Sequence, residues 1–129
     1  SAHSEKVVDF WQALEMKVIR STPEEHDQIL AHVSHLPHFL VSALCHALGN
    51  QPKEWSNGSG QGLRDTTRIA AGSPAIWKDI AQQNRGEILK ALDHFDAESK
   101  NLRLLLEEND SEKLFRWLDK SKVYRESLD

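Results

Sequence analysis

The spacing of hydrophobic residues divides the chain into helices separated by short polar segments. In residues 5–14 the apolar side chains recur on one helical face, which predicts a first helix. The run from Met16 to Arg20 has the β-branched character of a short strand and is the only convincing strand in the pattern. Because a single strand leaves its backbone N–H and C=O groups unpaired, we expect its sheet to lie upstream of this sequence.

A second helix is predicted to begin after Thr22. Thr22 is the expected N-cap, Pro23 suits the first helical position, and Glu25 completes a capping box. Apolar residues then recur at three- and four-residue spacing as far as Gly49, the expected C′ residue. Pro37 lies inside this helix. Because proline removes an internal hydrogen bond and clashes with the preceding turn, we expect a kink in the four residues before it.

Three further elements follow. Residues 49–62 contain four glycines and a proline and are predicted to form a loop. A short helix is expected from Leu63 to about Ala71. Ser73 and Pro74 supply a cap and a first-turn residue for a helix whose apolar positions continue to about Glu108, and a final helix is expected from about Ser111.

The helix expected from Pro74 to Glu108 implies a partner. At 1.5 Å per residue it would extend about 50 Å, which exceeds the diameter of a compact domain of this size. We therefore expect a homodimer that forms through the long helices. The fold class is predicted to be all-α: a helical dimerisation domain over residues 22–129 with two long helices, preceded in residues 1–21 by a helix–strand remnant of another domain.

Composition narrows the classes of partner and compartment. The formal net charge of −4 provides no general attraction for nucleic acid or anionic lipid, so neither partner is expected. No apolar run reaches the ~18 residues of a membrane span, and the N-terminus lacks the pattern of a signal peptide. The single cysteine, Cys45, looks buried and cannot form an internal disulfide, which favours a reducing compartment and hence the cytoplasm.

Four of the seven histidines cluster in one short segment, at His26, His32, His35 and His38. One hypothesis is a zinc site formed by His35, His38 and either Cys45 or His46. The sequence contains neither HExxH nor CxxC, so no metal is expected. The alternatives are that these histidines are ordinary polar helix residues, or that one of them donates a hydrogen bond to a substrate oxygen.

Arg64 and Arg68 are one helical turn apart, with Asp65 beside them. A solvated ion pair is one interpretation. An anion site is the other, because the glycine-rich loop allows close approach to the backbone and the helix N-terminus attracts negative charge. The planar fork of arginine also suits a carboxylate.

Two motifs in this order and spacing resemble the C-terminal helical domain of the prephenate dehydrogenase family, which includes the arogenate and cyclohexadienyl dehydrogenases. They are HVSHLPHFLVSAL and GLRDTTRIAAGSPAIWKDI, followed by Asn84. The preceding EKVVDFWQALEMKVIRSTPEEHD resembles the end of the family's nucleotide-binding domain, so residues 1–21 would be its remnant. The resemblance implies oxidative decarboxylation of prephenate or arogenate with NAD or NADP, in tyrosine biosynthesis.

The resemblance also implies that the catalytic and cofactor-binding residues lie in a different part of the protein from the substrate-binding residues. The general-base histidine and the glycine fingerprint for the dinucleotide lie upstream in family members, so no catalytic or cofactor-binding residue is expected in this chain. The chain alone should be inactive and should not bind NAD well. It would supply the substrate-binding side of the site and the dimer contact. The runner-up hypothesis is a non-enzymatic helical interaction module whose arginines are surface charges.

Site residues follow from the match to the motifs. Arg68 is expected to hold a substrate carboxylate, with Arg64 as its basic partner and His38, the second histidine of HLPH, beside them. Asp65 matches an acidic residue that pairs with arginine across the dimer, and Trp77 an aromatic position near the pocket. His35 also matches, with packing or orientation of neighbouring groups as an equal alternative. The family's glycine run and phenylalanine are replaced by Gln61 and Leu63, which leaves the choice between prephenate and arogenate open.

Overall fold

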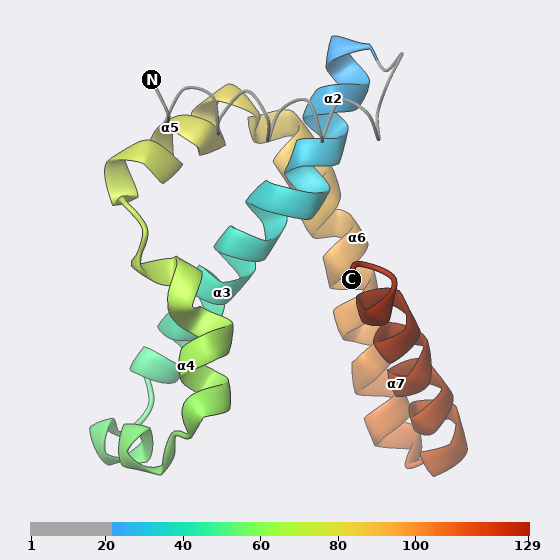
Figure 1. Ribbon diagram of the computed structural model, residues 1–129. Coiled ribbons are helices and arrows are strands. Elements are labelled where there is room, and N and C mark those ends of the chain that lie inside the picture. The colour runs from blue at the N-terminus through green and yellow to red at the C-terminus, as the bar shows by residue number, and fades with distance from the viewer. Residues whose placement is uncertain (1–21) are drawn as a thin grey trace. The chain divides into compact units, whose positions relative to one another are not determined.

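The computed structural model describes residues 22–129, which form helices and contain no strand (Figure 1). This confirms the all-α prediction for that part of the chain. The elements are α2 (Pro23–Leu30), the π-helical η1 (Ala31–His35), α3 (Leu36–Gly49), the 3₁₀ helix η2 (Lys53–Gly58), α4 (Gln61–Thr67), the 3₁₀ helix η3 (Arg68–Ala71), α5 (Pro74–Gln83), α6 (Arg85–Glu108) and α7 (Ser111–Glu126). The helix and strand predicted within residues 1–21 lie outside the described residues, and the assignment of those residues to a separate domain stays a prediction.

The chain separates into two compact units, with the division between Ala91 and Leu92 inside α6. The described part of the first unit comprises α2 to α5 and the first turns of α6. The second unit comprises the rest of α6 together with α7. None of the helices over residues 22–129 has the length and apolar character needed to cross a membrane.

The predicted helix after Thr22 forms with the predicted cap. The Glu25 amide donates to the Thr22 hydroxyl over 3.1 Å, and the Thr22 amide donates to the Glu25 carboxylate over 3.3 Å. The helix then runs through η1 into α3, where the Leu36 amide donates to the carbonyl of Ala31, five residues earlier. Pro37 explains this π turn, because proline has no amide hydrogen and its ring crowds the carbonyl four residues before it. The distortion expected before Pro37 therefore takes the form of a widened turn.

The segment predicted to be a loop is only partly irregular. A 3₁₀ helix, η2, occupies Lys53–Gly58. The following helix begins at Gln61, two residues before the expected start, and tightens from α4 into the 3₁₀ turn η3 at Arg68. Gly49, predicted as the residue just beyond the helix, is instead its last residue, with Asn50 as the C-cap.

The prediction of a single long helix from Pro74 to Glu108 is wrong. Its cap forms as expected, since the Ile76 amide donates to the Ser73 hydroxyl over 3.3 Å. The helix is interrupted at Asn84, whose φ of −122° and ψ of 29° leave the helical region, and the chain changes direction between α5 and α6 (Figure 1). At this break the Asn84 side chain donates to the Asp27 carbonyl of α2, a contact that the local apolar pattern could not predict.

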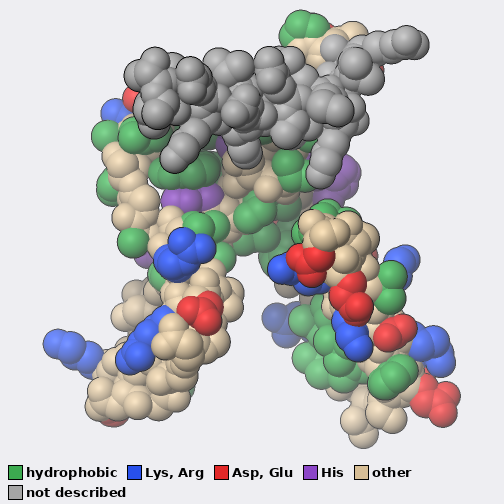
Figure 2. All heavy atoms as spheres, in the orientation of Figure 1, with side chains coloured by type: hydrophobic (Ala, Val, Ile, Leu, Met, Phe, Trp, Pro, Cys, Tyr) green, Lys and Arg blue, Asp and Glu red, His purple; other side chains and the backbone are tan. Residues whose placement is uncertain are grey.

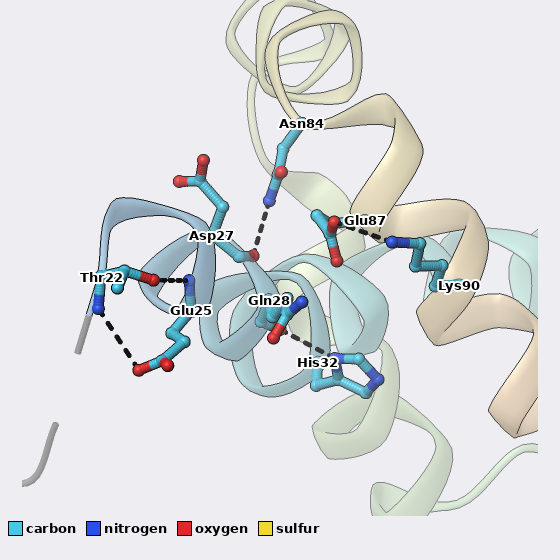
Figure 3. A network of polar contacts seen from close by, with 8 residues as sticks. All are labelled: Thr22, Glu25, Asp27, Gln28, His32, Asn84, Glu87 and Lys90. Atoms are coloured by element: carbon cyan, nitrogen blue, oxygen red, sulfur yellow. Dashed lines mark hydrogen bonds and ion pairs between the residues drawn. The ribbon is translucent and has the colours of Figure 1, made fainter.

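The core of the first unit is small. Ala31 on η1 and Ala91 on α6 are fully buried, and Ile88 is 6% exposed. These side chains come from the part of the long first helix at the π turn and from the start of α6. The Asn84 side chain joins the same two regions by donating to the Asp27 carbonyl over 2.9 Å (Figure 3).

The second unit is a helical hairpin. Asn109 ends α6 with a φ of 54°, a left-handed conformation that asparagine tolerates, and Asp110 caps α7 by accepting from the Lys113 amide over 3.0 Å. The indole of Trp117 on α7 donates to the Glu98 carboxylate on α6 over 3.0 Å. That hydrogen bond, followed by one from Asn101, lowers the pKa of Glu98. The start of α7 at Ser111 confirms the final helix that was predicted from about that residue.

Candidate functional site

Trp77 on α5 is the centre of an aromatic cluster with the first helix. Its ring lies flat against His38, with centroids 3.6 Å apart and planes inclined by 5°. His35 meets the same indole edge-on at 6.2 Å, and Phe39 does so at 5.8 Å. The structure therefore brings His35 and His38 to one partner, and the widened turn η1 (Ala31–His35) ends at His35. In Figure 2 histidine side chains appear among hydrophobic ones in this unit.

Gly72 lies at the edge of this stack, where a larger residue would not fit without movement. A Cβ atom at Gly72 would be 3.1 Å from the Trp77 Nε1 and 3.3 Å from the His38 Cε1. The Gly72 amide donates to the Ile69 carbonyl over 3.1 Å, which closes the 3₁₀ turn η3. A close approach of backbone to ring is a recognised use of glycine. The chain thus passes from the arginine-bearing segment to the aromatic cluster through a residue at which a Cβ atom would crowd both rings.

The two cluster histidines have depressed basicity. Burial lowers the pKa of His38, which is 6% exposed. Burial also lowers the pKa of His35, and the nearby negative charge of Asp27 partly offsets this. The His35 Nδ1 lies 3.3 Å from the Asn84 side-chain nitrogen. His38 forms no hydrogen bond to any residue from 22 to 129.

Arg64 on α4 and Arg68 on η3 are both exposed, and neither forms an ion pair within the described part of the chain. Asp65, expected to pair with an arginine, accepts instead from the side-chain Nε2 of Gln61 over 2.8 Å. The solvated ion pair considered from the sequence is therefore not formed here. Figure 2 shows basic and acidic side chains side by side on the surface of the α4–η3 segment. Both guanidinium groups keep their hydrogen-bond donors for another molecule.

The remaining candidates do not form a site. Residues 22–129 contain no group of three or more His, Cys, Asp or Glu side chains that could hold a metal ion. Cys45 is exposed, which corrects the expectation of a buried thiol, and together with His46 it lines an open groove of about 600 Å³ between α3 and the α4–η3 segment. The other lining residues are Ser42, Gly49, Asn50, Thr67, Ala70 and Ala71. The groove includes neither arginine nor any ring of the aromatic cluster.

The sequence motifs identify three members of the aromatic cluster, His35, His38 and Trp77, but neither Phe39 of the cluster nor Gly72 at its edge. Phe39 was counted as neither core nor site, although it directly follows the HLPH motif. Gly72 was not singled out. Its position just before the Ser73 cap was a usable signal, since a glycine between a short helix and a capped helix often marks a close approach.

The chain matches the family model "Prephenate dehydrogenase, dimerization domain" over residues 22–120. It is 36% identical to the prephenate dehydrogenase of Bacillus subtilis over 85% of this chain and 30% of that protein. It is 33% identical to the cyclohexadienyl dehydrogenase of Zymomonas mobilis over 95% of this chain and 43% of that protein. The chain thus spans less than half the length of either relative.

Solved structures of similar fold include two dehydrogenases. Prephenate dehydrogenase from Aquifex aeolicus, in complex with hydroxyphenyl propionate and NAD⁺, superposes with a TM-score of 0.78 at 32% identity, over 84% of this chain and 39% of that one. Synechocystis arogenate dehydrogenase superposes with a TM-score of 0.79 at 26% identity, over 97% of this chain and 48% of that one. With the family model covering most of its length, the chain belongs to the prephenate dehydrogenase dimerization-domain family.

Proposed function

We propose that this chain is the dimerisation and substrate-binding part of an enzyme that oxidatively decarboxylates prephenate or arogenate with NAD or NADP in tyrosine biosynthesis. The match of residues 22–120 to the dimerization domain of prephenate dehydrogenase carries the proposal. The names of the relatives support the substrate class, since they are prephenate, cyclohexadienyl and arogenate dehydrogenases.

Arg68 holds a carboxylate of the substrate, with Arg64 as a second cation one turn earlier. Both side chains are exposed and have no ion-pair partner among residues 22–129, so a dicarboxylate ligand does not compete with an internal acid. A guanidinium group binds a carboxylate through two parallel hydrogen bonds. Asp65, one residue from Arg64, would repel the same carboxylate, and in this proposal it pairs with an arginine across the dimer.

The aromatic cluster forms the wall beside these cations. Trp77 supplies a rigid apolar surface, and His38, held flat against it at 3.6 Å, supplies ring nitrogens that no other described residue uses. Burial lowers the pKa of His38, so at neutral pH it acts as a neutral hydrogen-bonding group rather than as a third cation. His35 orients neighbouring groups or donates a hydrogen bond to the substrate. No residue of this chain is assigned the role of general base.

The dinucleotide does not fit the described residues. Gly58 ends η2, Gly60 lies between η2 and α4, and Gly62 lies in α4. No strand precedes them within residues 22–129, whereas the dinucleotide fingerprint needs a strand before its glycines. NAD or NADP would therefore be bound outside residues 22–129. We keep the prediction that this chain alone binds NAD weakly and is inactive.

Homodimer formation through the long helices is also proposed. Several large apolar side chains of the second unit are exposed, among them Phe115 at 70%, Leu106 at 59% and Leu104 at 52%, while Leu105 is the one buried hydrophobic residue described there. Exposed apolar surface on this scale is typical of an interface. Light scattering at micromolar concentration should give the mass of a dimer. A monomeric mass would contradict this part of the proposal.

The substrate assignment is tested by substitution of Arg68 in the complete enzyme that carries this domain. Arg68→Ala should raise KM for prephenate or arogenate by about 30- to 1000-fold, as for loss of a charged hydrogen-bonded partner. Arg68→Lys should give an intermediate value, because lysine keeps the charge but loses the fork. The exposed Arg116 on α7 provides the control, and Arg116→Ala should leave KM unchanged. An unchanged KM in Arg68→Ala would overturn the assignment.

A further inference from the structure

Asn84 separates α5 from α6, and its own amide and carbonyl keep helical backbone partners on either side. The Asn84 amide donates to the Ile80 carbonyl over 3.0 Å, and the Asn84 carbonyl accepts from the Ile88 amide over 3.0 Å. No proline occurs at this junction. The departure of φ to −122° therefore coincides with a side chain that reaches across to the first helix, where it contacts Asp27 and His35.

The two contacts fix which way the Asn84 amide faces. Its side-chain nitrogen lies 2.9 Å from the Asp27 carbonyl oxygen (Figure 3) and 3.3 Å from the His35 Nδ1. A backbone carbonyl can only accept, so the atom that faces it must be the NH₂ group. The same nitrogen then donates its second hydrogen to His35. Because an NH₂ group cannot accept, the His35 Nδ1 must be the acceptor and carries no proton.

His32, one turn earlier, has the opposite arrangement. Its Nδ1 lies 2.8 Å from the Gln28 carbonyl oxygen, so that nitrogen must carry a proton and donate (Figure 3). Two histidines three residues apart thus hold their protons differently. His32 has a backbone acceptor at Nδ1, and His35 has a side-chain donor there.

We propose that Asn84 is a positioning residue that locks His35 in the tautomer protonated at Nε2, so that His35 presents an N–H donor and no acceptor beside the His38–Trp77 stack. The lowered basicity of His35 supports a neutral ring, with Asp27 as the charged group that opposes this. Under the proposed function, on which this step rests, the Nε2–H donates to an oxygen of the bound substrate. Asn84 also holds the start of α6 against α2, which keeps α5 and its Trp77 in place.

The tautomer can be measured directly in the full 129-residue chain. Long-range proton–nitrogen correlation spectra of the ¹⁵N-labelled histidines, recorded at neutral pH, should show an unprotonated Nδ1 in His35 and a protonated Nδ1 in His32, which serves as the internal reference. A protonated Nδ1 in wild-type His35 would overturn the proposal without any variant.

Two substitutions of Asn84 sharpen the test. In Asn84→Asp the carboxylate can only accept, so His35 should move its proton to Nδ1 or gain a second proton. In Asn84→Ala both tautomers should be populated. Asn101→Ala, which removes an exposed asparagine of α6, should leave the His35 spectrum unchanged. Far-UV circular dichroism checks that each variant stays helical. A His35 tautomer that is the same in wild type and in a folded Asn84→Ala would also overturn the proposal.

The functional step is tested in the complete enzyme. Asn84→Ala should lower kcat/KM about tenfold, as for loss of one hydrogen bond, and Asn84→Asp should also lower it where the His35 proton has moved to Nδ1, because Nε2 then has no hydrogen to donate. If the Asn84 variants change the His35 tautomer but leave kcat/KM unchanged, only the proposed donation from His35 to the substrate is overturned. Failure of Arg68→Ala to change KM would instead overturn the proposed function, so the two failures are distinguishable.

Discussion

His38 and Trp77 lie in parallel contact, with ring centroids 3.6 Å apart and an interplanar angle of 5°, although they belong to helices separated by the whole α4–η3 segment. The contact joins the motif that contains HLPH to the motif that contains GSPAIW. It explains why both motifs occur together: one supplies the ring, and the other supplies the indole that orients it. The aromatic cluster is consequently a unit of packing as well as a candidate ligand surface.

Replacement of the Trp77 indole should destabilise the aromatic cluster. Trp77→Leu is expected to lower the free energy of unfolding by about 1–3 kcal/mol, because the half-buried ring loses its stacking partner and its edge contacts. Urea unfolding followed by circular dichroism measures this. Lys78→Ala, at the neighbouring exposed position, is the matched control and should change stability by no more than about 0.5 kcal/mol. Equal effects of the two substitutions would show that the stack is not stabilising.

Enlargement of Gly72 should disturb the same stack from its edge. A methyl group there must displace the Trp77 or His38 ring, which it would approach to 3.1 and 3.3 Å, so Gly72→Ala should cost about 1–3 kcal/mol. The ring-current shift of the His38 Cε1 proton should fall at the same time. Gly86→Ala is the control, since a Cβ there meets nothing within 4 Å, and on helix propensity it should stabilise by about 0.5–1 kcal/mol. A stabilising Gly72→Ala would contradict the inferred crowding.

Stability should depend on the pH through the cluster histidines. Burial lowers the pKa of both His35 and His38 in the folded state, so the unfolded chain binds protons first as the pH falls below about 6.5. The free energy of unfolding should therefore decrease with falling pH until the lowered folded-state pKa values are reached. His38→Phe keeps a flat ring but cannot titrate, and the slope should become shallower. An identical slope in this variant would rule out a contribution from His38.

The helical hairpin of the second unit provides a prediction that does not depend on the aromatic cluster. The Trp117 indole is the largest cause of the lowered pKa of Glu98, ahead of Asn101 and Lys120. Trp117→Phe removes that donor and should raise the pKa of Glu98 towards its ordinary value, measured from the carboxyl carbon shift. Asn101→Ala should raise it less. A larger effect of Asn101→Ala would contradict the geometry at 3.0 and 3.5 Å.

Local sequence signals identified the capped starts of α2 and α5 and the family. The capping residues Thr22 and Ser73 form the predicted hydrogen bonds with amides three residues away, because capping depends only on near neighbours. The motifs around His38 and Arg68 carried the resemblance that the family match later established. The motifs do not show that Arg64 and Arg68 form no ion pair with another residue of the described part of the chain, because Asp65 has an equally local hydrogen-bond partner in Gln61.

Other features arise only when the helices pack. The apolar pattern continued past Asn84 and predicted one helix, yet the Asn84 side chain finds partners 57 and 49 residues earlier in the chain, at Asp27 and His35. Helix propensity of a single asparagine is a weak preference, and contacts of this range override it. The proton position on His35 and the stack of His38 on Trp77 have the same origin. Short-range preferences thus account for the capped starts of α2 and α5, whereas the break at Asn84 and the candidate site depend on contacts between distant residues that no local pattern encodes.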